Sequence, residues 1–541
     1  MGTFINKGNE GFQSAIEGTY VDKTGLIDAI NKTLGTERRY TCVTRSRRFG
    51  KTIAADMLCA YYDKSCDSRS LFEGLEIAQP DEIEEKDGKL IKKTDRQFEK
   101  HLNKYPVIYL DVTDFTTKYR RDANLSTHIQ EDIIAELLST YDGIERLPND
   151  DLMDILVKIA EKTHEKFIMI IDEWDAICRE LENDEKAMDN YVDMLRRLFK
   201  GSNSKKVFAG VYMTGILPIK RYNTESALNN FREYSVVKPG ALAPYFGFVP
   251  SEVENIAKQS DLSIDELKAW YDGYQIGAEP SVFNPWSVME AVAEGECGSY
   301  WTATGAYDSV ANYINLNYAG LKDDIIGMLA GERCDVVTTG FENDLSKIKS
   351  KDDVLTILIH LGYLSYDKKS GQCYIPNREV REAMEGAIKA CKWERVIDTL
   401  NASKHLLTAT LNMNAEAVAR GIELTHDEET SILSYNDENS LACVLSIAYY
   451  YAKNDYIMHR ELATGKGFAD IVFIPRSRVD SPALLIELKC NKSADAAIDQ
   501  IKRKEYPAKV AEYTGDILLV GINYDRETKT HTCRIERYTK E

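Results

Sequence analysis

Four short, almost continuously apolar runs alternate with helical stretches in the first 235 residues, and this pattern most constrains the fold. The runs are Tyr40–Thr44, Val107–Val112, Phe167–Asp172 and Val207–Thr214. A strand that is apolar along its whole length is buried on both faces, as in a parallel sheet that helices cover on each side. The sequence therefore predicts an α/β domain built on a parallel sheet over residues 1–235.

The first of these strands leads into a motif that opens a helix, residues 44–52 (TRSRRFGKT). Its last three residues, Gly50, Lys51 and Thr52, match the end of a P-loop, in which backbone N–H groups and the helix N-terminus cradle phosphates. There Lys51 reaches the β- and γ-phosphate oxygens and Thr52 holds Mg²⁺. The full pattern, G-x-x-x-x-G-K-[ST], requires glycine at position 45, where this chain has Arg45.

Three arginines add positive charge to this loop: Arg45, Arg47 and Arg48. We expect them to contact the nucleotide. Two alternatives stay open, which are that they act on another ligand or that they are simply solvated.

The third apolar run ends in paired carboxylates, in the segment 166–175 (KFIMIIDEWD). This is the form of a Walker B motif, in which Asp172 would hold the Mg²⁺ of the nucleotide through water and Glu173 would polarise the attacking water. A buried strand that ends at a solvated acidic turn would explain the strand, but not its position about 120 residues after G-K-T. The fourth run ends at Thr214, which could sense the γ-phosphate, although threonine before glycine is also plain turn chemistry. Together these residues predict a site for ATP and Mg²⁺.

The central residues, 236–430, have a mainly helical pattern. Within them, Val354–Tyr366 followed by Gln372–Pro376 predicts a helix, a turn and a short hairpin, as in a winged helix; a generic helical linker domain is the alternative. Earlier in the chain, the charge-dense segment 79–95 (QPDEIEEKDGKLIKKTD) favours a solvated surface loop.

The final residues, 431–541, have a different order of predicted helices and strands from the preceding region. A helix from about Glu438 to Lys453 precedes three strands, and a helix from Ala494 precedes a strand at Asp516–Ile522. This order predicts a compact αβββαβ domain.

Charged residues on two neighbouring strands of that domain suggest a metal-dependent nuclease. Asp470 lies on the second strand, and an E-L-K tripeptide ends the third, so that alternation places Glu487 and Lys489 on one face. Two carboxylates suit Mg²⁺ or Mn²⁺, which polarises a scissile phosphate, while the lysine orients a water or stabilises developing charge. Glu438 on the leading helix and Gln500 on the following helix strengthen the hypothesis. The alternative is an exposed cross-strand salt bridge.

The charge distribution agrees with a local nucleic-acid site. The 541 residues include 68 Lys+Arg and 87 Asp+Glu, and the net charge of −19 excludes a basic coat over the whole surface. Residues 431–541 hold 16 Lys+Arg and 16 Asp+Glu, so the negative charge belongs to the first 430 residues. Several cations near the proposed site could track the phosphate backbone of DNA or RNA, or form a solvated helix face: Lys489, Lys492, Lys502, Arg503, Lys504 and Lys509.

Cysteine usage and hydropathy indicate the compartment. The 11 cysteines are scattered singly without a C-x-x-C pair, which favours a reducing environment over a disulfide framework or a structural zinc site. No apolar run approaches the ~20 residues of a membrane span, and the first residues resemble neither a signal peptide nor a myristoylation signal. We therefore expect a cytoplasmic protein without a membrane partner.

Several short segments resemble two known families. YVDKT (20–24), RSRRFGKT (45–52), DEWD (172–175), TGILP (214–218), YDGY (271–274) and NPWS (284–287) resemble the bacterial AAA-ATPase-like family. YNDE (435–438), GKGFAD (465–470) and ELK (487–489) resemble the PD-(D/E)xK nuclease superfamily. Together these segments extend over nearly the whole chain.

The resemblance implies a P-loop ATPase of the STAND or archaeal-ATPase type joined to a restriction-endonuclease-like fold. It assigns nucleotide roles to Lys51, Thr52, Asp172 and Glu173, and nuclease roles to Asp470, Glu487 and Lys489. Glu438 matches the helical glutamate of some branches of the superfamily. Arg45 occupies the position of the first P-loop glycine, and in having arginine there the chain resembles other members of the family.

We therefore expect three domains, at 1–235, 236–430 and 431–541, that form an ATP-gated, Mg²⁺-dependent nuclease with a role in phage defence or mobile-element biology. One alternative is a nucleotide-dependent switch whose nuclease-like domain binds nucleic acid or a partner without cutting. Another is a remodelling ATPase that uses the tail for recruitment. The sequence leaves open whether ATP is hydrolysed or only bound, and whether the chain forms a homo-oligomer.

Overall fold

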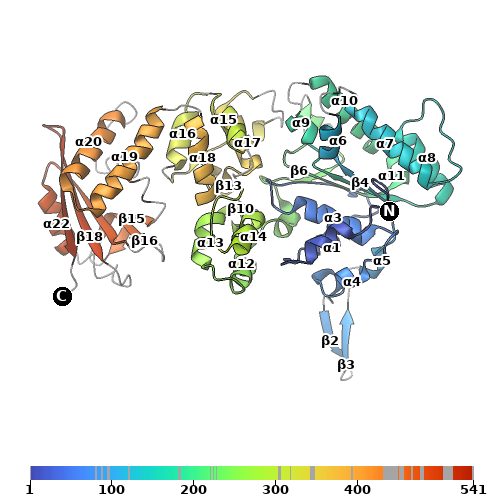
Figure 1. Cartoon of the computed structure of the whole chain (residues 1–541), viewed down its shortest axis with the longest axis horizontal. Helices are drawn as coiled ribbons and strands as arrows, with labels where there is room; N and C mark the ends of the chain where they lie inside the picture. Colours follow the sequence, from blue (N-terminus) through green and yellow to red (C-terminus); the bar gives the residue numbers. More distant parts are fainter. Residues whose placement is uncertain are drawn as a thin grey trace. The chain divides into compact units, whose positions relative to one another are not determined.

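The structure is a computed structural model (Figure 1). It describes residues 2–541 apart from positions 80–81, 87–88, 94–97, 120–121, 123, 181–183, 220, 223–224, 227, 302–305, 317, 330, 342–347, 391–393, 430–448, 450–451, 453–455, 465–466, 476–480, 504–515 and 539–541. The chain divides into two compact units. The first comprises Met1–Ala303 and Asp335–Asn377, and the second comprises Thr304–Cys334 and Arg378–Glu541.

A five-stranded parallel sheet forms the centre of the first unit, as the sequence predicts. Its order is β4-β5-β6-β1-β9, and all four pairings are parallel. The strands are β1 (Tyr40–Thr44), β4 (Val107–Asp111), β5 (Phe167–Asp172), β6 (Phe208–Gly215) and β9 (Arg232–Tyr234). Every residue of β1, β5 and β6 is buried, which explains their continuous apolar sequence.

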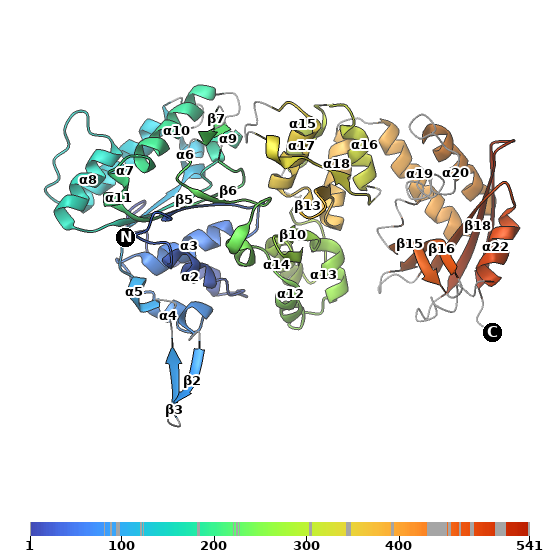
Figure 2. The same cartoon turned by 180° about the vertical axis from the view of Figure 1, so that it is seen from behind.

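Helices cover both faces of this sheet, and the two opposite views agree on the arrangement (Figures 1 and 2). One face carries α6 (Val112–Lys118), α7 (Leu125–Thr140), α8 (Leu152–Thr163), α9 (Ala176–Glu180) and α10 (Glu185–Phe199). The other face carries α1 (Glu10–Ile16), α2 (Gly25–Asn31) and α3 (Lys51–Tyr62). The carboxyl ends of the central strands therefore meet at one edge, where ligands bind in sheets of this kind.

The charged segment 79–95 contains a hairpin rather than only a loop. Strands β2 (Glu82–Lys86) and β3 (Lys89–Lys93) pair antiparallel, with Glu82 opposite Lys93. The expectation of a loop was wrong for the residues of these two strands. Asp-Gly at positions 87–88, the two residues that join the strands, is a strong hairpin signal that the high charge density concealed.

The rest of the first unit is largely helical. It contains α12 (Pro250–Ala257), α13 (Ile264–Tyr271), α14 (Pro285–Glu294) and α17 (Lys351–Leu361), and the hairpins β10 (Tyr274–Ile276) with β11 (Glu279–Val282) and β13 (Ser365–Asp367) with β14 (Gln372–Tyr374). Ser350 begins α17 with a capping box, and Gly362 ends it at φ 93°, in the left-handed region that favours glycine. The helix, turn and hairpin expected here are confirmed, and because of this glycine the helix ends at Leu361, five residues before Tyr366.

The second unit centres on a mixed sheet, β15-β16-β17-β18-β19, in which only β17 and β18 are parallel. The strands are β15 (Tyr456–Thr464), β16 (Gly467–Pro475), β17 (Ala483–Cys490), β18 (Ile517–Asp525) and β19 (Thr530–Tyr538), with α22 (Ala494–Arg503) between β17 and β18. The strand β19 adds one element to the predicted αβββαβ order. The expected leading helix lies almost wholly outside the described residues.

Two layers of helices sandwich this sheet (Figures 1 and 2). Ile498 and Ile501 of α22 pack against one face. On the other face, α19 (Glu394–Leu411) and α20 (Ala415–Glu429) contribute Leu406, Val418 and Ile422 to the core. The unit also contains α15 (Ala306–Ile314), α16 (Leu321–Leu329) and α18 (Arg378–Ala390). The boundaries at 235 and 430 stay predictions.

Two expectations about the chain as a whole concern cysteines and membranes. The nine cysteines that the structure describes are all free thiols. Among the described helices, none combines the length and the apolar character needed to cross a bilayer.

Candidate nucleotide and nuclease sites

The P-loop residues lie between β1 and α3, at the carboxyl edge of the parallel sheet. Gly50 caps α3 at φ 83°, a left-handed conformation that glycine adopts without steric cost. Lys51 is the first helical residue and its side chain is only 4% exposed. Its ammonium donates to the Ser46 carbonyl at 3.2 Å and lies 3.6 Å from Glu173 Oε1. The lysine is therefore held at the mouth of the loop by groups that phosphate oxygens could replace.

Asp172 ends β5 and is completely buried. Its Oδ1 accepts the Glu173 N–H at 2.9 Å, whereas its Oδ2 has no hydrogen-bond partner among the described residues. Burial and then the charge of Glu173 raise the pKa of Asp172 to about 7, although the nearby Thr52 hydroxyl and Lys51 act in the opposite direction. A hydroxyl and an unsatisfied carboxylate oxygen are hard donors, so these residues fit Mg²⁺.

Hydrogen bonds join the D-E-W-D segment (172–175) directly to the residues that follow β6. Asp175 is completely buried and accepts the N–H groups of Ile216 at 3.1 Å and Leu217 at 2.8 Å. A Cβ at Gly215 would overlap Asp175 Oδ1, so only glycine fits between the two segments. Thr214 precedes it, with a buried hydroxyl that has no hydrogen-bond partner among the described residues. A ligand group able to bond this hydroxyl would satisfy it, in line with the expected sensing role.

The three loop arginines have different surroundings. Arg45 is fully buried: its Nη1 donates to the carbonyls of Thr44 at 2.9 Å and Tyr234 at 2.7 Å, and burial lowers its pKa to about 10. Arg48 donates to the Tyr300 carbonyl at 3.4 Å and stacks over the Trp286 ring. Arg47 is exposed. Arg45 thus bonds to the backbone of two strands, and nucleotide contact by any of the three stays a prediction.

The expected nuclease residues of β17 are brought together on the sheet face that α22 covers. Glu487 is 1% exposed, and Lys489 donates to its Oε1 at 3.0 Å and to the Leu488 carbonyl at 2.9 Å. Gln500 of α22 donates to the same carboxylate oxygen. The side chain of Leu488 packs in the core on the opposite face, as alternation requires. This pair is buried and lies within one strand, unlike an exposed cross-strand salt bridge.

The remaining nuclease residues are described only in part. The pairing of β16 with β17 aligns Ile471 with Ile486, and continuing this register by one residue places Asp470 opposite Glu487. The side chain of Asp470 and the whole of Glu438 lie outside the described residues. Among the side chains that are described, no group of three or more His, Cys, Asp or Glu is arranged to hold a metal ion. Two carboxylates with water and phosphate oxygens would still form a donor set that fits Mg²⁺.

Comparison with known protein families agrees with the two kinds of domain that the sequence predicts. Residues 8–224 match the model of a family described as predicted AAA-ATPase, and residues 436–533 match that of the PD-(D/E)XK nuclease superfamily. The chain combines an AAA-ATPase-like domain with a PD-(D/E)XK nuclease superfamily domain. No curated protein matches the sequence.

Among solved structures, the chain is similar to the Walker-type ATPase PABY2304 of Pyrococcus abyssi, at 12% identity and a TM-score of 0.34, over 68% of this chain and 96% of that one. It is also similar to the ORC2 protein of Aeropyrum pernix, at 15% identity and a TM-score of 0.29, over 72% and 99% of the two chains. A third similar structure is Cdc6p of Pyrobaculum aerophilum, at 10% identity and a TM-score of 0.27, over 71% and 98%.

Within the AAA-ATPase-like domain, Arg179 is a site residue that sequence reasoning missed. Its guanidinium contacts the Glu173 carboxylate and donates from Nε to Asp175 Oδ2 at 3.0 Å. Glu173 itself has φ 48°, a left-handed conformation that is uncommon for a residue with a Cβ. Arg179 lies four residues after Asp175 on the next helix, and this i,i+4 spacing of opposite charges was the available signal.

Proposed function

We propose that the AAA-ATPase-like domain binds and hydrolyses ATP with Mg²⁺, and that its nucleotide state gates cleavage of nucleic acid by the nuclease superfamily domain. The observation that carries the first half is the buried Asp172 oxygen without a partner, next to Thr52 and Lys51. The second half rests on the buried pair of Glu487 and Lys489.

The chemistry at the P-loop follows from the charges already in place. Lys51 exchanges Glu173 and the Ser46 carbonyl for phosphate oxygens when ATP binds. Thr52 and Asp172 would hold Mg²⁺, which neutralises phosphate charge when bound. Binding of cations near Asp172 also favours its ionised form, which burial otherwise disfavours.

Glu173 is the group that activates water in this proposal. Once Lys51 turns to phosphate, Arg179 is the cation that still holds the Glu173 carboxylate. Arg179 in turn is anchored to Asp175, whose carboxylate accepts the backbone N–H groups of Ile216 and Leu217, just after Thr214. The carboxylate that orients water is therefore linked through Arg179 and Asp175 to the backbone that follows Thr214, the residue whose hydroxyl meets the γ-phosphate.

The buried pair in the nuclease superfamily domain favours a functional role over a structural one. Removing a carboxylate and an ammonium from water costs several kcal/mol for each ion, and apolar residues of similar size often stabilise a core as well or better. Glu487 and Asp470 would hold Mg²⁺, which polarises the scissile phosphate when bound. Lys489 stabilises the charge that develops on the phosphate or orients the attacking water.

Gating requires that nucleotide bind two states of the protein with unequal affinity. A role in phage defence or mobile-element biology belongs to this proposal and rests on the combination of the two domains.

The experiment uses the purified full-length chain with plasmid DNA, single-stranded DNA and RNA, in Mg²⁺ or Mn²⁺, with and without ATP. We expect cleavage of at least one substrate, and we expect ATP to change its rate. Glu487→Gln and Lys489→Met should abolish cleavage. Lys529→Gln removes an exposed lysine from the turn between β18 and β19 and is the matched control. Lys51→Ala should abolish ATP hydrolysis and the effect of ATP on cleavage.

The outcomes separate the two halves of the proposal. If the wild-type chain cuts no substrate, or Lys489→Met cuts as well as wild type, the nuclease half is wrong and a nucleotide-dependent switch takes its place. If Lys51→Ala hydrolyses ATP at the wild-type rate, the ATPase assignment is wrong.

A further inference from the structure

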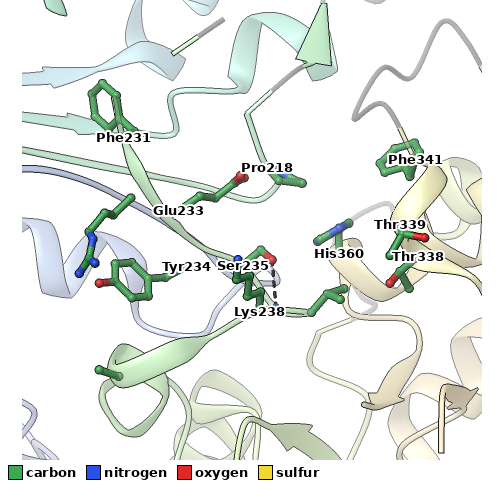
Figure 3. Close-up of a pocket in the computed structure, with 13 residues that line it drawn as sticks. Pro218, Phe231, Glu233, Tyr234, Ser235, Lys238, Thr338, Thr339, Phe341 and His360 are labelled. Carbon is green, nitrogen blue, oxygen red and sulfur yellow. Dashed lines mark hydrogen bonds between the residues drawn. The ribbon is translucent and has the colours of Figure 1, made fainter. Parts of the chain in front are cut away.

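A cavity of about 800 Å³ lies within the first unit, apart from the P-loop. One wall comes from the edge of the parallel sheet, from Pro218 and the segment 231–238 (Figure 3). The facing wall comes from Thr338 to Phe341 and from His360 of α17. Neither the P-loop residues nor Asp172 line this cavity. Its volume is in the range of sites that hold small molecules.

A buried polar atom in this cavity lacks a partner. His360 is 3% exposed, and its Nδ1 has no hydrogen-bond partner among the described residues. The imidazole stacks on the Phe341 ring, with centroids 6.3 Å apart and planes at 28°. Burial lowers the pKa of His360 to about 4, so the ring is neutral at pH 7. A buried polar group without a partner is destabilising, and a hydrogen bond from a ligand would remove that cost.

Cations at the cavity define the charge of such a ligand. Arg232 and Lys238 both line the cavity and are exposed, and within the described part of the chain neither forms an ion pair. Among the described residues of the lining, the one carboxylate is that of Glu233, which accepts the Ile219 N–H at 2.8 Å. Two cations against one backbone-bonded carboxylate favour an anion, although the whole chain carries a net charge of −19.

The other lining groups favour a ligand that also carries a flat ring. Thr338 and Thr339 line the cavity beside the stacked pair of Phe341 and His360 (Figure 3). Aromatic surfaces with a few hydrogen-bonding groups suit a planar heterocycle, and the cations suit its phosphate.

Both walls of the cavity also contact the P-loop. On one side, the Tyr234 carbonyl accepts a hydrogen bond from the buried guanidinium of Arg45 at 2.7 Å. On the other, α17 ends at Gly362, where a Cβ would lie 2.7 Å from Ser46 Cβ. The Ser46 carbonyl in turn accepts the Lys51 ammonium. Closure of the walls on a ligand would therefore displace residues of the P-loop, which holds the ATP phosphates in the proposed function.

We propose that this cavity is an effector site for a small phosphate-bearing ring compound of mononucleotide size, and that its occupancy changes the affinity of the P-loop for ATP. The binding half is independent of the proposed function. The coupling half rests on ATP binding at the P-loop, and linkage requires it to be reciprocal.

The test is calorimetric titration of the full-length chain with AMP, and separately with inorganic phosphate. It compares wild type, Lys51→Ala, the rim variant Arg232→Glu/Lys238→Glu and the control Arg38→Glu, which reverses another exposed cation of the same unit. We expect AMP to bind wild type, Lys51→Ala and Arg38→Glu equally, and the rim variant at least about tenfold more weakly. Phosphate alone should bind more weakly than AMP. Circular dichroism of each variant checks that it is folded.

Three results would overturn the site: no binding of AMP to wild type up to about 10 mM, equal binding to the rim variant, or loss of binding in Lys51→Ala, which would place AMP at the P-loop. The effector role is tested by titrating a non-hydrolysable ATP analogue with and without AMP. An unchanged analogue affinity while AMP is bound overturns the coupling and leaves the ATPase assignment untouched. Absence of analogue binding in any condition would instead contradict the proposed function.

Discussion

Replacing Asp172 by asparagine should make the nucleotide-free protein more resistant to unfolding as the pH rises. Burial and the neighbouring Glu173 hold the pKa of the Asp172 carboxyl at about 7 in the folded chain, against 3.8 as its ordinary value. An acid whose pKa is higher in the folded state binds its proton more tightly there, so raising the pH from about 4 to 7 favours unfolding. Asparagine has no proton to lose in this range, and its Oδ1 can still accept the Glu173 N–H.

The size of the effect follows from the pKa difference. A rise of about three units corresponds to about 4 kcal/mol of lost stability above pH 7, at 1.36 kcal/mol per unit. Between pH 5 and pH 8, wild type should lose about 2 to 3 kcal/mol relative to Asp172→Asn. For a domain of 150 to 250 residues, this is a relative change in melting temperature of about 5 to 10 °C.

The assay is thermal unfolding of both proteins at pH 5 and pH 8 in EDTA, followed by the same measurement with Mg²⁺ and ATP. Mg²⁺ and ATP should raise the melting temperature of wild type at pH 8 and have little effect on the variant. Because the chain has two compact units, the transition that ATP shifts is the one to compare. A difference between the two proteins that stays constant from pH 5 to pH 8 would refute the reasoning.

Three further substitutions test contacts around the sites. Arg179→Ala should lower the kcat of ATP hydrolysis about 10- to 100-fold because Glu173 loses its fixed cation, with partial recovery in Arg179→Lys; an unchanged kcat would remove Arg179 from the site. Gly215→Ala should destabilise the first unit by about 1 to 3 kcal/mol, because its methyl group overlaps Asp175, and a melting temperature equal to wild type would contradict this close packing. Gly362→Ala strains a left-handed residue next to the P-loop by about 1 to 2 kcal/mol and should weaken binding of an ATP analogue, whereas Gly371→Ala, also left-handed but in open space, should not.

Local sequence was enough to predict the parallel sheet and the residues at its carboxyl edge. The run that becomes β5 is apolar because both of its faces are buried, and Asp172 follows it directly. The position of Lys51 at the start of α3 likewise depends on neighbouring residues, since Gly50 adopts the left-handed conformation that begins the helix. The hairpin at residues 82–93 was missed because its charge density outweighed the Asp-Gly signal.

Strand alternation was also enough to place Glu487 and Lys489 on one face of β17, because the period of two is a property of the extended backbone. It could not place Gln500, which reaches Glu487 from α22. The strand β19 was missed as well, because it alternates between exposed and partly buried residues at the edge of the sheet and lacks a continuous apolar run.

By itself, then, the sequence determined the α/β sheet, the order of the motifs and the faces on which the charged residues lie, since each depends on residues close together in the chain. Only the tertiary structure decided that Arg45 bonds to a carbonyl 189 residues away, that Arg179 holds Glu173, and that Asp172 is buried deeply enough to raise its pKa. It also decided that His360 lines a cavity with Arg232. These features arise from contacts between distant segments and from the exclusion of water, which no local pattern records.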